Sequence, residues 1–364
     1  MNTKLDKFLI KNKIETPCFV YDLKKIKNNI SKITKAFSNY KNFELFYAVK
    51  ANNNKEILKI IIKQGISLHV SSKEELIYSL RLKPRNISYT APIISKEILK
   101  LWKKHKFEIN INNSLDINYF RNNKNLGIRI NPLIGWAYFG GTKAGGKFSQ
   151  FGIPINEIKG KILKSVSRLH CHTSSDSYEY KLFFKQLKLL LKISSKYKNI
   201  KTINIGGGIA TPITKNEHFF KINLFANRII TILDNFNKKY NRNIKLQLEL
   251  GNYLVRNIGI YITKVVQVEK KFGKNYVFTD GTMHHLKGSD IDYIITPNSK
   301  KTQKKSFVIG KTCQRNDLFI KNYNLPKVKI FDNLIIEKVG AYCMSQADNF
   351  NLVPKPKEYI IKDD

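Results

Sequence analysis

The sequence predicts an α/β protein in which a closed (βα)8 barrel of the TIM type precedes a smaller all-β domain. Short apolar stretches recur along the first 250 residues of the 364-residue chain. The segments between them carry apolar residues at i, i+3, i+4 and i+7, which is typical of helices that pack one face on a sheet. Beyond residue 255 this periodicity ends, and strand-like segments follow one another across short turns.

Eight apolar stretches are predicted to be the barrel strands. They are LFYAVK (45–50), ISLHVS (66–71), NISYTA (86–91), FEINI (107–111), LGIRIN (126–131), SRLHCH (167–172), TINIGG (202–207) and KLQLEL (245–250). The first five recur at about 20-residue intervals, which suits compact βα units. A doubly wound sheet is the alternative, but such sheets more often have about five to seven strands.

The connecting segments and the C-terminal part support this division. Helices are expected in NKEILKIIIKQG and YKLFFKQLKLLLKISSKYK, among others. After residue 255 the predicted strands lie in GIYITKVVQVEKKFGKNYVFTDG, KSFVIGKTC, DLFIKNYNLP and DNLIIEKVGAY. Without a low-complexity linker between the two parts, we expect them to pack tightly.

The chain is strongly basic, with a formal charge of +38 from 65 Lys+Arg and 27 Asp+Glu. Such a balance is typical of proteins that bind nucleic acid or another polyanion. Here the lysines are scattered and accompany abundant Ile and Asn, as in proteins from AT-rich genomes. We therefore expect only non-specific polyanion binding at low salt, and no specific nucleic-acid partner.

Other features predict a cytoplasmic protein. No apolar run approaches the ~20 residues that span a membrane, and residues 1–17 lack the apolar core of a signal peptide. The four cysteines form no CxxC pair and no zinc-type spacing, so we expect neither a disulfide framework nor a metal site.

In such a barrel the active site lies at the carboxyl ends of the strands. Lys50 ends the first strand, His172 and its neighbouring serines follow the sixth, and Glu249 ends the eighth. The seventh ends in the glycine run 206–208, whose backbone N–H groups could approach a phosphate, although the run could equally be a tight turn.

A lysine that faces a phosphate site suggests a Schiff base with pyridoxal phosphate. Glu249 is placed to hold the pyridine nitrogen protonated, and His172 is placed to stack on the ring. Taken singly, Glu249 could be a structural salt-bridge partner and His172 a core histidine. Their placement on one rim with Lys50 favours the cofactor.

A family resemblance covers nearly the whole chain, in order. The motifs that carry it are TPCFVYDLKKI, FYAVKAN, RINP, KFSQFGI, LHCHTSS, NIGGGIATP, LELGNYLV, VIGKTCQRNDLF and GAYCMSQADNFN. Together they resemble the fold-type III, alanine-racemase-like pyridoxal-phosphate decarboxylases, a group that includes diaminopimelate and ornithine decarboxylases. The resemblance implies a cofactor-binding barrel at 23–255 and a β domain at 256–364, to which residues 1–22 contribute.

The resemblance also implies roles for individual residues. Lys50 would form the Schiff base, His172 would stack on the pyridine ring and Glu249 would pair with its nitrogen. The other expected cofactor contacts are Ser175, Gly206, Gly207, Gly208, Gly251, Tyr342 and Arg129.

Catalysis would need a second subunit. Cys313 matches the family's cysteine that reaches the neighbouring active site and controls protonation after CO2 loss, which implies a homodimer with shared sites. Phe350 would lie near the cofactor and the partner's cysteine. Together with Gln314, Asn252 and Asp317, it completes the set of expected contacts to a small amino-acid substrate.

The chain departs from the family at positions that read the substrate. Asn252 stands where the family has an arginine, Gln314 replaces the acid after the cysteine, and residues 283–290 (MHHLKGSD) lack the second arginine. His69 replaces the acid usual at the end of strand two. Because neither asparagine nor lysine reproduces a bidentate arginine, we expect an L-amino acid or amino-acid-bearing intermediate other than meso-diaminopimelate.

Three alternatives remain open. One is a diaminopimelate decarboxylase that makes L-lysine, and another is an inactive decarboxylase-like binding protein, against which Lys50, His172, Glu249 and Cys313 argue. A racemase on the same barrel would need a catalytic tyrosine where this chain has KTCQRND.

Overall fold

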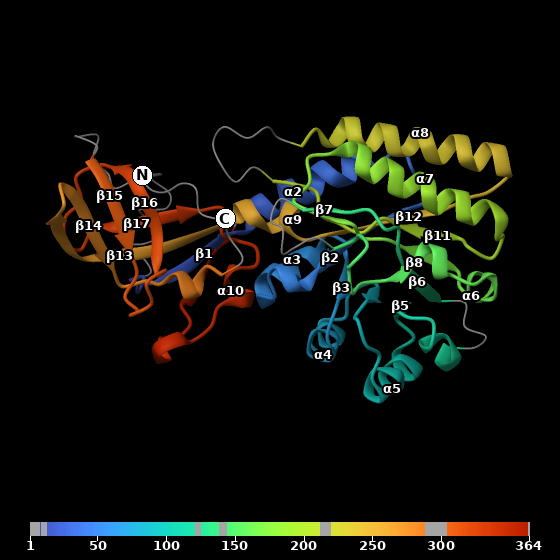
Figure 1. The fold of residues 1–364 in the computed structure, drawn as a ribbon, viewed down its shortest axis with the longest axis horizontal. Coiled ribbons are helices and arrows are strands. Elements are labelled where there is room, and N and C mark those ends of the chain that lie inside the picture. Colours follow the sequence, from blue (N-terminus) through green and yellow to red (C-terminus); the bar gives the residue numbers. More distant parts are fainter. Residues whose placement is uncertain are drawn as a thin grey trace.

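The computed structural model describes residue 8 and residues 13–120, 125–137, 144–211, 220–287 and 304–362. Figure 1 shows a barrel wrapped by helices beside a sheet domain that holds both the first and the last strands of the described chain. In the described part of the chain, no helix is long and apolar enough to cross a bilayer.

Eight parallel strands close the barrel, as the sequence predicts. Each pairs with the next, and the last pairs back with the first. In spatial order they are β2 (Phe43–Ala48), β3 (Ser67–Val70), β4 (Ile87–Tyr89), β5 (Glu108–Ile111), β6 (Leu126–Asn131), β9 (Arg168–His170), β11 (Thr202–Asn204) and β12 (Lys245–Leu250). The short strand β8 (Ile153–Pro154) pairs in parallel with the end of β6, and β7 (Trp136–Ala137) pairs with β10 (Ser174–Ser175) outside the barrel.

Helices cover the outside of the barrel and follow the predicted periodicity. They are α2 (Leu23–Ala36), α3 (Lys55–Lys63), α4 (Lys73–Arg81), α5 (Lys96–His105), α6 (Gly160–Ser165), α7 (Tyr180–Lys196) and α8 (Ile222–Tyr240). In α3, Asn54 caps the first turn, and Ile57, Leu58 and Ile61 are buried against the strands. Between β5 and β6, the described residues form the 3-10 helix η2 (Asp116–Phe120).

Several strands end earlier than the apolar pattern suggests. Strand β2 stops at Ala48, and Lys50 lies in the 3-10 helix η1 (Val49–Ala51). Strand β9 stops at His170 and β11 at Asn204, so His172 and the glycine run lie in the turns that follow. The functional side chains therefore lie just beyond the strand ends, where the backbone leaves the sheet and is free to face a ligand.

The second part of the molecule is a seven-stranded sheet. Its strands are β1 (Cys18–Asp22), β13 (Gly259–Lys271), β14 (Lys274–Thr279), β15 (Lys304–Ile309), β16 (Leu318–Leu325), β17 (Asn333–Glu337) and β18 (Lys357–Ile361). Strand β1 pairs antiparallel with β13 and parallel with β18. Most of residues 1–12 lie outside the described chain, so the boundaries 1–22, 23–255 and 256–364 stay predictions.

The β domain is hydrogen-bonded to the chain just after the first barrel strand. The Tyr342 backbone N–H donates to the Ala51 carbonyl at 2.7 Å, and the Asn52 side chain donates to the Gly340 carbonyl at 2.9 Å. The Ser345 hydroxyl donates to the Lys50 carbonyl at 2.9 Å. These bonds place Tyr342 and helix α10 (Cys343–Gln346) at the mouth of the barrel, where helix α9 (Asn252–Val255) directly follows β12.

Candidate active site

A buried carboxylate, Glu249, is the centre of a polar cluster inside the barrel mouth. One oxygen lies 3.0 Å from His170 Nε2 and 3.5 Å from His69 Nε2. The other accepts a hydrogen bond of 2.8 Å from the Asn204 amide. Burial alone would raise the pKa of Glu249, but His69, His170 and Asn204 outweigh it, so the pKa is lowered and the carboxylate stays ionised.

The glycine run packs against this cluster through its backbone. The Gly207 N–H donates to His172 Nδ1 at 3.1 Å, so in the neutral ring the proton is on Nε2. A methyl group on Gly207 would lie 1.9 Å from the Glu249 carbonyl oxygen, and one on Gly208 would lie 2.0 Å from the Ser174 carbonyl oxygen. Gly206 and Gly208 also have φ values of +66° and +90°. Only glycine permits this turn.

Lys50 is accessible to solvent but extends into the barrel mouth, where the protein limits the hydration of its ammonium. This desolvation lowers the pKa of Lys50, and the charge of Arg129 lowers it further, while Glu249 and Glu75 oppose the shift. Burial lowers the pKa of Arg129 to about 10, and its guanidinium lies over the Phe151 ring at 4.6 Å. Desolvation also lowers the pKa of His172, so the cluster combines a neutral imidazole with an amine that loses its proton readily.

A second set of contacts lies at Asp176, which directly follows Ser175. The neighbouring Asp176 carboxylate accepts from the Asn252 amide at 2.8 and 2.9 Å and from Arg256 Nη2 at 3.1 Å. A methyl group on Gly251 would lie 3.3 Å from the Tyr342 hydroxyl. The structure thus brings four predicted cofactor or substrate residues, Ser175, Gly251, Asn252 and Tyr342, to one place.

Cys313 and Gln314 lie on the β-domain loop between β15 and β16. The exposed Cys313 thiol contacts Asn351 Oδ1 at 3.5 Å, and the Gln314 amide oxygen contacts His284 Nε2. His284 also bonds Asp348 through Nδ1 at 2.9 Å. The loop is therefore attached to the C-terminal segment that includes Asp348 and Asn351.

The remaining two predicted substrate residues, Phe350 and Asp317, differ in their exposure to solvent. Phe350 is exposed and stacks on the His284 ring, with centroids 4.5 Å apart. Asp317 is 2% exposed, and its carboxylate accepts from the Met283 N–H and from the Thr312 N–H and hydroxyl. The sequence predicts that Asp317 contacts the substrate. This geometry instead favours a structural role, in which Asp317 holds the loop in place.

A comparison with protein families decides the chemistry of this site. The family described as "Pyridoxal-dependent decarboxylase, pyridoxal binding domain" matches residues 23–256. The chain belongs to this family. The prediction of a pyridoxal-phosphate-dependent amino-acid decarboxylase is thereby confirmed, as is the prediction of a barrel followed by a β domain.

Curated relatives match this chain over almost its whole length. A diaminopimelate decarboxylase of Buchnera aphidicola from Schizaphis graminum is 29% identical, with 100% of this chain and 92% of that protein covered. One from Methanothermobacter thermautotrophicus is 24% identical, with 96% and 87% covered.

Solved structures show the same fold. A diaminopimelate decarboxylase of Helicobacter pylori complexed with L-lysine has a TM-score of 0.86 at 23% identity, with 98% of this chain and 94% of that chain covered. The arginine decarboxylase of Paramecium bursaria Chlorella virus bound to agmatine has a TM-score of 0.83 at 17% identity, with 99% and 100% covered.

The residues present fit the cofactor of the decarboxylase family. The glycine turn leaves backbone close to Glu249 and His172, and Lys50 offers an amine at the same mouth. In the described part of the chain, Arg256 Nε is buried without a hydrogen-bond partner, while its Nη2 contacts Asp176, the residue after Ser175. A buried donor without a partner suits an acceptor such as a phosphate oxygen.

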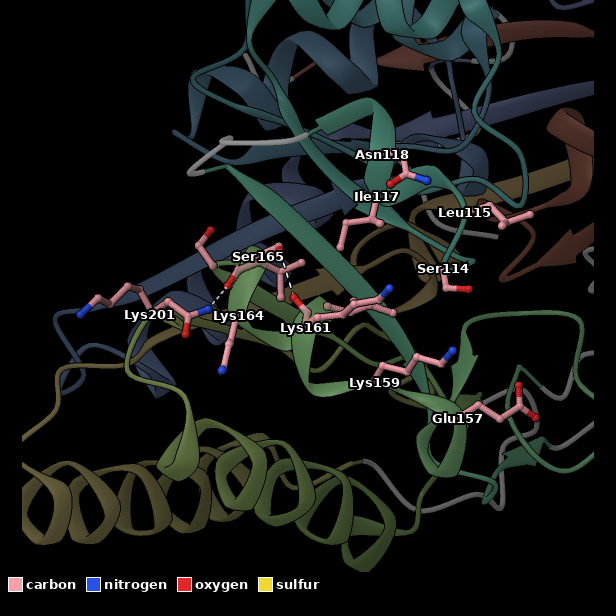
Figure 2. A pocket seen from close by; sticks show the side chains of 14 residues that line it. Ser114, Leu115, Ile117, Asn118, Glu157, Lys159, Lys161, Lys164, Ser165 and Lys201 are labelled. Atoms are coloured by element: carbon pink, nitrogen blue, oxygen red, sulfur yellow. Dashed lines mark hydrogen bonds between the residues drawn. The ribbon is translucent and has the colours of Figure 1, made fainter.

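A separate pocket of about 1050 Å³ is not the decarboxylase site. Figure 2 shows its lysine-rich wall, which includes Lys159, Lys161, Lys164 and Lys201. Lys201 directly precedes β11, so the pocket opens toward the amino-terminal ends of the strands. The carboxyl ends, with Glu249 and the glycine turn, lie at the opposite end of the barrel.

Sequence reasoning assigned no role to several residues that build the site. They are His170, Asn204, Asp176, Arg256, His284 and Asp348. His170 and Asn204 precede predicted site residues by two positions on the same strand ends, and this period-2 spacing was a usable signal for side chains on the same face. Arg256 stands one helical turn after Asn252, which also could have been noticed. His284 and Asp348 meet across 64 positions of sequence, without a local signal.

Proposed function

We propose that the chain removes the α-carboxyl group of an L-amino acid at the barrel mouth, with Lys50 as the residue that holds pyridoxal phosphate. The observation that carries this proposal is the position of Lys50 in η1, directly beyond β2, at the same strand ends of the barrel as Glu249 and the glycine run. When bound, the cofactor supplies a carbonyl group for the substrate amine and a ring that withdraws electrons.

The chain's own residues would then do the following. Glu249, which stays ionised, would accept a hydrogen bond from the pyridine nitrogen and hold it positive. His172, whose Nδ1 is taken by Gly207, would keep its ring fixed against the cofactor face. Backbone N–H groups of Gly206 to Gly208, with Ser175, Gly251 and Tyr342, would hold the phosphate, and Arg129 would support the network beside the ring.

Proton delivery would come from a second copy of the chain. CO2 leaves without the electron pair of its bond to the α-carbon, and the Cys313 thiol of the partner subunit would give its proton to that carbon. In each chain Cys313 is exposed on the β domain, where a partner could meet it. We therefore propose a homodimer with shared active sites.

Mixing two inactive variants tests this sharing. Random association of Lys50→Ala with Cys313→Ala chains should restore about a quarter of the wild-type activity, because half of the dimers have one intact site of two. Light scattering should give twice the chain mass. A monomer, or a mixture that stays inactive although the chains exchange, would contradict the shared site.

Of the substrates that the sequence leaves open, we propose meso-diaminopimelate, with L-lysine as product. The support is that the relatives described above carry the name diaminopimelate decarboxylase across 87% or more of their length. Purified holoenzyme should release CO2 from meso-diaminopimelate, and Lys50→Ala should not. Release from another L-amino acid in a substrate panel, without release from meso-diaminopimelate, would contradict the proposal.

A second candidate is another L-amino acid or a conjugate that carries one. The observation in its favour is that Asn252 is bound to Asp176, in place of a free arginine, and that a neutral amide stands at Gln314. The same panel distinguishes the two candidates. We also propose a cytoplasmic location, which the four free cysteines support; cell fractionation with antibody detection would test it.

A further inference from the structure

His69 is a buried side chain of the barrel mouth that takes no part in the proposed function. It stands near the end of β3 and is 6% exposed, and in the described part of the chain neither of its ring nitrogens has a hydrogen-bond partner. Its Nε2 lies 3.5 Å from Glu249 Oε2, the oxygen that His170 bonds at 3.0 Å. Because a polar group that is buried without a hydrogen bond is destabilised, this imidazole suits a polar ligand.

The register of the barrel strands gives the depth of His69. Glu249 is paired with Phe46 on β2, whereas His69 is paired with Ala48, two residues further toward the carboxyl end. Lys50 follows two residues after Ala48, in η1. Parallel neighbours rise together along the sheet, by about 3.3 Å per residue. The backbone of His69 therefore lies between the level of Glu249 and the level of Lys50.

The strand order gives the side of the barrel from which His69 projects. Ser175 follows β9 and the glycine run follows β11, so the expected phosphate contacts lie on that side. In the closed order β2-β3-β4-β5-β6-β9-β11-β12, strand β3 is four strands away from β9. Four strands are half of the circumference of an eight-stranded barrel. His69 therefore faces the expected phosphate contacts from the opposite wall.

The covalent structure of pyridoxal phosphate connects these positions. Its ring nitrogen and its carbonyl-bearing carbon are opposite each other, and the phosphate arm and the ring hydroxyl lie on the two edges between them. A ring with its nitrogen at Glu249, its carbonyl carbon at Lys50 and its phosphate at the glycine run turns its hydroxyl toward the wall of β3. We propose that His69 binds the cofactor there, through a hydrogen bond to the ring hydroxyl. This inference rests on the proposed function.

An imidazole suits this contact whichever of its nitrogens carries the proton. Burial lowers the pKa of His69 to about 4, so the ring is neutral and has one donor and one acceptor. The hydroxyl can be the partner of either. The acid that the family has at this position can only accept when it is ionised, and it would repel an ionised hydroxyl. With His69 in place of that acid, this chain gains a contact that the family's pattern lacks.

A ligand without the ring hydroxyl tests the contact. Cofactor-free wild type and His69→Leu are each titrated with pyridoxal phosphate and with 3-deoxypyridoxal phosphate, by equilibrium dialysis. His69→Leu should weaken the binding of pyridoxal phosphate about fivefold to tenfold more than the binding of the deoxy analogue. A loss that stems from disturbed packing, or from the chemistry of the analogue itself, is common to both sides of the comparison and cancels.

Two further variants assign the difference to His69. His170→Leu removes the other imidazole at Glu249 Oε2, on the side of β9, and should weaken the binding of both compounds by the same factor. His69→Asn has a side chain too short to reach the same point. It should show the same hydroxyl-dependent loss as His69→Leu, and it replaces that variant if leucine prevents folding.

The outcomes separate this inference from the proposed function. Equal losses for the two compounds in the His69 variants would overturn the inference alone, as would a hydroxyl-dependent loss of the same size in His170→Leu. A chain that binds no pyridoxal phosphate, or a Lys50→Ala variant that binds it as tightly as wild type, would overturn the proposed function and this inference with it.

Discussion

The barrel mouth and the β-domain loop hold the two halves of the candidate site in different ways. Around Glu249 the side chains are buried, and backbone approaches so closely that the glycines cannot be replaced. Around Gln314, exposed side chains of the β15–β16 loop and of the C-terminal segment meet the buried His284 and Asp317. The positions that we expect to face the cofactor match the family's motifs, whereas the departures concern groups expected to meet substrate. Loop residues can change recognition without disturbing the rigid scaffold that holds the cofactor.

The largest expected effect is the loss of decarboxylation when Lys50, in the barrel half of the site, is replaced. Lys50→Ala should lower decarboxylation about a thousandfold or more, because it removes the group that binds the cofactor covalently. The absorbance at about 420 nm that marks this linkage should disappear. Lys201→Ala, in the remote pocket of Figure 2, is the matched control and should retain both. A persistent band in Lys50→Ala would show that another residue holds the cofactor.

Glycine substitutions test whether the barrel half tolerates added side-chain atoms as poorly as its close backbone contacts indicate. Gly207→Ala places a methyl group 1.9 Å from the Glu249 carbonyl oxygen, so we expect about 3 kcal/mol loss in the free energy of unfolding. Gly65→Ala, at φ +76° with open space around it, should cost about 1 kcal/mol. Urea unfolding measures both, and a titration with pyridoxal phosphate should show weakened binding in Gly207→Ala only. An equal loss of unfolding free energy in the two variants would contradict the expectation that the turn at Gly207 is less tolerant than the position of Gly65.

The histidines of the barrel half should make stability depend on pH. Burial lowers the pKa of His69 to about 4 from its ordinary 6.5, against the opposing charge of Glu249. Between these values the unfolded chain binds the proton and the folded chain does not. Stability from this group is therefore present above pH 6.5 and is lost as the pH falls toward 4, by about 3 kcal/mol at most.

This prediction is measured on the cofactor-free protein by urea unfolding between pH 7 and 4.5. His69→Asn should make stability fall less steeply over that range, since the variant has one fewer group to protonate. His105→Asn, at an exposed histidine of α5, serves as control. An identical slope in His69→Asn would assign the acid sensitivity to other groups.

The smallest effect is expected in the loop half. Asp348→Asn weakens the hold on His284 and should raise KM about threefold to tenfold, the range of one hydrogen bond. Its kcat and its affinity for pyridoxal phosphate should stay close to wild type. Steady-state kinetics and cofactor titration measure these quantities. A loss of cofactor binding would mean that the two halves are coupled.

Local patterns were sufficient for much of this description. The eight strands and the helices between them follow from apolar periodicity, because each strand or helix buries one face whatever the rest of the chain does. Lys50, His172, Glu249 and the glycine run were predicted to lie together because parallel strands bring their carboxyl ends to one rim. The early ends of β2 and β9 were not predicted, since in each case the apolar run of the sequence continues past the end of the strand.

By itself, the sequence determined the order of the strands, the family and the residue types at the rim. Only the tertiary structure decided that Glu249 is held by His170 and Asn204, and that His284 stands between Asp348 and Gln314. The physical reason is that hydrogen bonds between distant segments leave no periodic trace in either segment. Whether an amide donates or accepts depends on the neighbour that folding places beside it.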